Sequence, residues 1–80
     1  MVMVHMGLPY NSMDNVVRVL RERTNPEYIN DEKYLGDDED IVSLYDDLAL
    51  ISRVSEEMYY TVLVTPYQYT VIAEILRETP

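Results

Sequence analysis

The pattern of hydrophobic and polar positions divides the chain into five predicted elements. Residues 2–8 alternate as a strand does, and residues 58–64 are rich in β-branched and aromatic residues, the composition of a strand. Three segments repeat their apolar residues at helical spacing, namely residues 12–24, 38–54 and 66–78. The order strand, helix, helix, strand, helix predicts a small α+β domain.

The first and last predicted helices have recognisable ends. Asn11 or Ser12 can cap the first, because a short side-chain oxygen accepts from the free N–H groups of a first turn. Pro26 follows its end, since the residue before a proline is pushed out of helical space. Thr65 and Gln68 have the spacing of a capping box at the start of the last helix.

The middle helix is the most periodic segment, but its C-terminal end has two interpretations. Its apolar stripe covers about 120° of one face and consists of Ile41, Leu44, Tyr45, Leu48 and Ile51. In the alternative, residues 48–54 form a strand that turns at 55–57 and pairs with the following strand. An isolated pair of strands is marginal in water, so we expect a further strand from this segment or from a second copy of the chain. The prediction is two to three helices on a two- or three-stranded sheet.

The connection over residues 25–37 carries more bulky apolar groups than a solvated loop needs. These groups are Tyr28, Ile29, Tyr34 and Leu35. They either fold back onto the core or are displayed for a partner, and folding back is the commoner outcome. Gly36 is expected to supply a positive φ before the next helix.

The 80 residues are predicted to form a single domain, residues 1–80, whose beginning has two interpretations. His5 followed by Met6 is the pair that a common cloning site leaves behind. Residues 1–5 are therefore either such a remnant or part of a short N-terminal strand.

The charge balance excludes one class of function and favours another. Fifteen Asp and Glu face six Lys and Arg, which gives a net charge of −9. Such a chain repels nucleic acid and anionic membranes, so we expect no direct nucleic-acid binding and no membrane partner. Its long-range partners are basic surfaces or cations. We expect the three neighbouring cations, Arg18, Arg21 and Arg23, to form internal ion pairs.

The candidate chemistry is sparse. There is no Cys and a single His, His5, so thiol chemistry is excluded and a His–carboxylate pair is improbable. Two Gly cannot form a glycine-rich phosphate loop. Residues 37–47 hold six carboxylates, but an EF-hand loop begun at Asp37 would place Val42 at the glycine position and Leu48 at the final glutamate. We therefore expect no enzyme, no cofactor and no dedicated metal site.

The remaining hypothesis is protein binding by a non-enzymatic module. An acidic surface with tyrosines at its edge can occupy the basic groove of a nucleic-acid-binding protein, as a phage-type inhibitor that mimics nucleic acid would. The predicted contact residues are Tyr28, Tyr34, Asp37, Asp38, Glu39, Asp40, Asp46, Asp47 and Leu50. Tyrosine is a frequent hot-spot residue, and carboxylates steer association.

The alternative hypothesis is a small self-associating structural or regulatory domain. Val42 and Leu50 fall outside the apolar stripe of the middle helix, and in this hypothesis they are buried with strand 59–64 between two copies. The acidity then serves only solubility or salt adaptation. With no signal-like segment or long apolar run, we expect a cytoplasmic protein and a possible homodimer.

Overall fold

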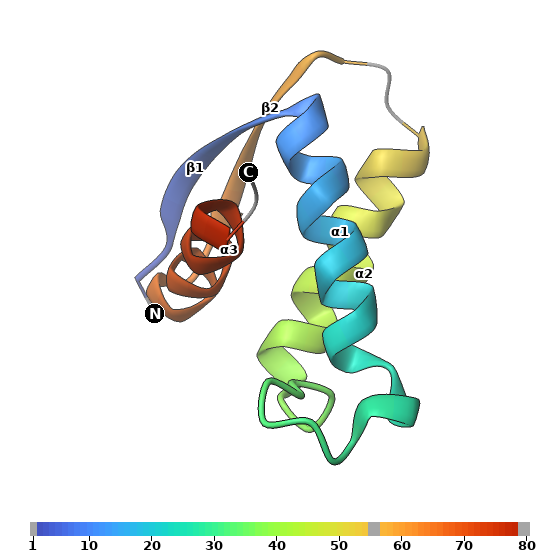
Figure 1. Cartoon of the computed structure of the whole chain (residues 1–80). Helices are drawn as coiled ribbons and strands as arrows, with labels where there is room; N and C mark the ends of the chain where they lie inside the picture. Colours follow the sequence, from blue (N-terminus) through green and yellow to red (C-terminus); the bar gives the residue numbers. More distant parts are fainter. Residues whose placement is uncertain (1, 55–56, 79–80) are drawn as a thin grey trace.

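The computed structural model describes residues 2–54 and 57–78 and shows three helices packed on a two-stranded antiparallel sheet (Figure 1). The elements are β1 (Val4–Pro9), α1 (Tyr10–Thr24), a short 3-10 helix (Pro26–Tyr28), α2 (Glu39–Val54), β2 (Tyr59–Val64) and α3 (Pro66–Glu78). In Figure 1, α1 and α2 form an antiparallel pair beside the layer that holds the strands and α3. The predicted α+β class is confirmed. Within the described ranges, no helix has the length and apolar character needed to cross a membrane.

The strands predicted over residues 2–8 and 58–64 are observed as Val4–Pro9 and Tyr59–Val64, and only one face of the sheet is buried. Met6 and Leu8 of β1 pair with Val62 and Tyr60 of β2, and all four side chains are buried. The intervening residues of both strands are exposed on the other face. Period-two alternation of this kind is expected when helices cover a single face of a sheet.

The helix predicted over residues 38–54 is confirmed, and the alternative of a third strand from residues 48–54 is wrong. These residues are the last two turns of α2, and the apolar stripe of that helix continues through the buried Leu48 and the half-buried Ile51. The predicted turn at 55–57 lies partly outside the described residues. The sheet consists of β1 and β2 in the described part of the chain, because helices that pack on its inner face stabilise it in place of a third strand.

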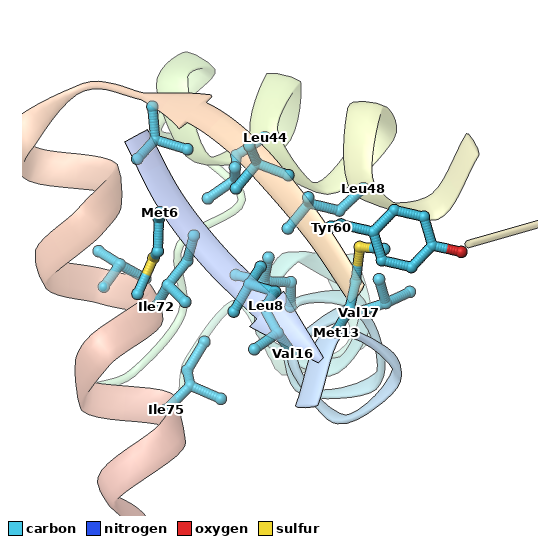
Figure 2. Close-up of a cluster of buried hydrophobic side chains, with 14 of the residues drawn as sticks. Met6, Leu8, Met13, Val16, Val17, Leu44, Leu48, Tyr60, Ile72 and Ile75 are labelled. Atoms are coloured by element: carbon cyan, nitrogen blue, oxygen red, sulfur yellow. The ribbon is translucent and has the colours of Figure 1, made fainter. Parts of the chain in front are cut away.

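The core lies between the inner face of the sheet and the three helices. Figure 2 shows side chains from both strands and from all three helices pointing into one cluster. Its buried members are Met6, Leu8, Met13, Val16, Val17, Leu20, Ile41, Leu44, Leu48, Tyr60, Val62, Val64, Val71, Ile72 and Ile75. Tyr60 is the one member of this cluster with a hydroxyl group in its side chain.

The beginning of α1 differs from the prediction. The helix starts at Tyr10, directly after β1, and no side chain caps it, so neither Asn11 nor Ser12 is the cap. Instead, the Tyr10 N–H donates to the Met58 carbonyl at 2.9 Å, which continues the pairing of the two strands into the helix. Met58, which directly precedes β2, therefore satisfies an N–H group that would otherwise be left to a cap or to water. The helix ends at Thr24, as predicted.

The start of α3 is the capping box that the sequence predicts. Thr65 Oγ1 accepts from the Gln68 N–H at 3.1 Å, and Gln68 Oε1 accepts from the Thr65 N–H at 2.9 Å. Two free donors of the first turn are thus satisfied reciprocally. Gln68 also donates to the Asp40 carbonyl at 2.9 Å, which ties α3 to the first turn of α2.

Replacing Thr65 with alanine is expected to lower the free energy of unfolding by about 1 kcal/mol, because it removes the acceptor of the Gln68 N–H. A denaturant melt measures the change. Thr70→Ala is the matched control, since its hydroxyl donates to a carbonyl one turn earlier in the same helix and caps nothing. Equal stability of the Thr65→Ala variant and the unmodified protein would contradict the role of Thr65 as cap.

The apolar groups of the connection between α1 and α2 divide between two outcomes. Leu35 packs against the core and its N–H donates to the Arg23 carbonyl at 2.7 Å, so this part folds back as predicted. Tyr28 and Ile29 are displayed, with 48% and 56% of their surface exposed. The expected positive φ of Gly36 is not observed. The absence of a side chain there instead gives room to the Tyr34 ring, which a Cβ on Gly36 would clash with.

The three arginines of α1 each have a partner within the chain, and in the described residues Arg23 is the one that forms an ion pair. Arg23 pairs with Glu78 of α3 at 2.7 Å. Arg21 donates to the Tyr45 hydroxyl of α2 at 3.2 Å, and Arg18 donates to Asn15 within α1. The prediction of ion pairs is thus correct for Arg23 and wrong for the other two, whose partners are neutral.

Candidate protein-binding surface

Asp38 forms the beginning of α2 and has a structural role. Its carboxylate accepts from the Asp40 N–H at 3.1 Å, and its carbonyl accepts from the N–H groups of Ile41 and Val42. Asp38 is therefore the N-cap, where a negative charge also interacts favourably with the helix dipole.

Asp38 also joins α2 to α3 through a tyrosine. A hydrogen bond to the Asp38 carboxylate, together with partial burial, raises the pKa of Tyr67 above its usual value. The carboxylate thus accepts from both the helix backbone and the phenol. Of the predicted contact residues, Asp38 is the one whose hydrogen bonds are already occupied within the chain.

The other predicted carboxylates form an exposed acidic surface, which we define as Asp37, Glu39, Asp40, Asp46 and Asp47. Glu39 and Asp46 are seven residues apart on α2, as are Asp40 and Asp47, so the members of each pair lie about 10.5 Å apart along one side of the helix. In the described part of the chain none of the five forms an ion pair, while both Arg23 and Lys33 pair with Glu78. The acidic surface therefore keeps its charge uncompensated.

Tyr34 lies at the edge of this acidic surface. It lines a shallow hollow together with Leu35, Asp38 and three members of the acidic surface, and its ring folds over Gly36. The structure thus brings one of the two predicted tyrosines against the carboxylates at the start of α2. Its half-buried position restricts the ring, which lowers the entropy cost of using it as a contact.

Tyr28 lies in different surroundings. It lines a groove of about 510 Å³ between α1, the connection and α3, together with Arg18, Arg23 and Lys33. Tyr34 lines the same groove on its other side. The structure therefore places Tyr28 away from the acidic surface, although it is near it in sequence, in a groove whose cations are accompanied by Glu22, Asp31 and Glu78.

Leu50 and Asp47 belong to a second groove, between α2 and β2. It has a volume of about 330 Å³, and Leu50 is 54% exposed at its rim. Sequence reasoning missed that Ile51, Thr61, Leu63 and Gln68 share this groove with them. The one sequence signal that could have indicated this groove was Leu63, an apolar residue on the outward face of its strand. Val42 is half-buried within its own chain, so Leu50 is the apolar outlier that remains exposed.

The arrangement has the chemistry of a contact surface. Across residues 2–54 and 57–78, no three side chains of the metal-binding types come together closely enough to hold an ion. Comparisons of the chain with known protein families, with curated proteins and with solved structures gave no match.

Proposed function

We propose that the protein is a non-enzymatic binding module whose acidic surface contacts a basic surface of its partner, as a nucleic-acid-binding protein presents. The observation that carries the proposal is that five exposed carboxylates on and before α2 have no cationic partner in the described part of the chain. Glu39 and Asp40 also lie in the first turn of α2, where the helix dipole favours a negative charge, but no cation in the described residues pairs with the cluster. An uncompensated cluster of one sign attracts an opposite surface over a distance of about one Debye length, roughly 8–10 Å at ordinary ionic strength.

Several cations of the chain lie away from the acidic surface. Arg23 and Lys33 pair with Glu78, and together with Arg18 they line the groove that contains Tyr28. The exposed side of α2 has a single cation, Arg53, in its last turn. The carboxylates at the beginning and middle of α2 are therefore offset by few cations on their own helix, and a basic partner would be steered there.

Apolar contacts at the edge of the acidic surface would supply affinity. Charges mainly raise the association rate and select the partner, whereas buried aromatic and aliphatic groups slow dissociation. Tyr34 at one end of the acidic surface and Leu50 further along α2 are the contacts of this kind. A complementary partner surface has basic residues around an apolar centre. An inhibitor that occupies the nucleic-acid groove of its partner would meet such a surface.

Neutralising Glu39, Asp40, Asp46 and Asp47 together, to Gln and Asn, is expected to slow association with a basic partner at least about tenfold and to flatten its salt dependence. The partner is first captured from a lysate at low salt and identified, and its association rate is then measured by stopped-flow fluorescence at several salt concentrations. Folding should survive, because these side chains are exposed and like charges on one helix repel.

The matched control neutralises four exposed acids elsewhere, namely Glu22, Glu27, Glu32 and Glu74. It changes the net charge by the same amount and leaves the acidic surface intact. If both fourfold variants slow association equally, net charge alone governs binding and the acidic surface is not the contact. If neither variant changes the rate, the proposal is wrong.

A further inference from the structure

The free edge of β2 presents a regular row of backbone groups. The Tyr10 N–H donates to the Met58 carbonyl. Because hydrogen-bonded and non-hydrogen-bonded pairs alternate along an antiparallel ladder, the register makes Leu8–Tyr60, Met6–Val62 and Val4–Val64 the hydrogen-bonded pairs. The N–H and C=O groups of Tyr59, Thr61 and Leu63 therefore point away from β1. By the same alternation, Pro9 and Tyr59 form a non-hydrogen-bonded pair. The ladder therefore needs no N–H from Pro9, which has none to donate.

The residues of β2 include none of those by which proteins usually protect an edge strand. The sequence of β2 is YYTVLV, without a charge, a proline or a glycine. The free edge of β1 is different, since it contains Gly7 and ends in Pro9. Within the described ranges the sheet has two strands, so no other strand pairs with the outer edge of β2.

A groove of about 330 Å³ lies beside this edge, between α2 and β2. Its floor consists of buried apolar side chains from α2 and β2, namely Leu44, Leu48, Val62 and Val64. Asp47 and Leu50 of α2 and the exposed Thr61 and Leu63 of β2 also line the groove. Gln68 lies at the end of the groove, where it is held by the Asp40 carbonyl. Backbone donors and acceptors thus run beside an apolar floor with a carboxylate at its rim.

We propose that this groove binds an extended segment of the basic partner, which pairs with β2 as a third strand. The inference rests on the proposed function and identifies how the partner is held. Main-chain hydrogen bonds to Thr61 and Leu63 supply register, and alternate apolar side chains of the segment fill the groove. Basic side chains of the segment reach Asp47 and the neighbouring carboxylates of the acidic surface.

Charge decides between a partner segment and a second copy of this chain. A second copy carries a net charge of −9 and would bring another Asp47 to the same edge. β2 itself offers no cation to pair with either carboxylate. A lysine- or arginine-bearing segment instead neutralises the rim, so the groove and the acidic surface favour the same occupant.

The direct test is amide hydrogen exchange on the unmodified protein, measured by NMR. The probe is an alternating valine–lysine peptide of about six residues, the usual length of a strand. With the peptide at about ten times its dissociation constant, exchange at Thr61 and Leu63 should slow about tenfold, because only the free protein exposes these amides. An alternating valine–glutamate peptide should give no protection. Unchanged exchange at both amides with the lysine peptide bound would overturn the proposal.

A backbone variant tests the same point by binding. Thr61→Pro removes an N–H that faces the edge and is outside the ladder with β1, whereas Thr61→Val keeps it. The proline variant should bind the lysine peptide at least about tenfold more weakly and the valine variant as the unmodified protein does. Equal binding by all three proteins would overturn strand addition. If the proline variant does not fold, as judged by circular dichroism, the exchange experiment decides alone.

Two further outcomes separate this inference from the proposed function. If the fourfold acidic variant loses the lysate partner but Thr61→Pro retains it, the acidic surface binds the partner and strand addition is wrong. If the lysine peptide protects the edge but the fourfold variant captures the partner normally, the proposed function fails and the groove stands. Protection of Thr61 that rises with protein concentration in the absence of peptide would show a second copy at the edge and overturn the proposal.

Discussion

The Leu8→Ala variant is expected to lose about 2–5 kcal/mol of unfolding free energy, the cost of removing a fully buried leucine side chain. Leu8 has no exposed surface, and it lies on the inner face of β1 opposite Tyr60, within the cluster of Figure 2. A domain of this size has about 4–12 kcal/mol of total stability. The variant should therefore be partly unfolded at 37 °C, or close to it, as measured by a urea titration followed by circular dichroism.

Leu63→Ala is the matched control, because it removes the same side chain from the other strand of the same sheet. Leu63 is 55% exposed on the outer face, so its loss should cost less than about 1 kcal/mol. The difference between the two variants reports which face of the sheet is buried. Equal losses would contradict the assignment of the inner face.

The Tyr60→Phe variant is expected to be more stable than the unmodified protein by about 1 kcal/mol or more. Tyr60 is buried, and its hydroxyl has no hydrogen-bond partner in the described part of the chain. A buried donor without a partner costs about 1–3 kcal/mol, while the ring of phenylalanine fills the same space. Thermal melts at one pH, with the midpoint and the unfolding enthalpy determined together, measure the gain.

The neighbouring tyrosine provides the control for this prediction. Tyr59→Phe removes a hydroxyl from the outer face of the same strand, where the residue is 59% exposed, and its stability should not change. A loss of stability in Tyr60→Phe would mean that the hydroxyl has a partner in the folded protein. The explanation of its burial as a cost would then be wrong.

The sequence alone predicts the helices and strands well where the signal is local. The bounds of α2, β2 and α3 agree with the prediction to within one residue, because helical spacing, strand alternation and the Thr65 capping box are all visible within one segment. The start of α1 is different, since its first N–H is satisfied by Met58, 48 positions further along the chain. A cap search among neighbouring residues cannot find such a partner.

The candidate site divides in the same way. Tyr34 and the carboxylates at the start of α2 are neighbours in sequence, and the structure keeps them together. Tyr28 is nearly as close in sequence but lies with Arg18 and Lys33, because the chain turns through the 3-10 helix. Leu50 is joined to Thr61 and Leu63 only by the packing of the fold.

The sequence by itself determines the acidity of the surface, the α+β class and the faces that each element buries, since these depend on residue type and on spacing within one segment. Only the tertiary structure decides that β1 pairs with β2 across two intervening helices, that the sheet stops at two strands, and that a groove runs along the edge of β2. The physical reason is that a strand's pairing partner and a groove's second wall come from distant segments. These distant segments come together because the whole core is buried at once, and the pattern within a single segment carries no information about that.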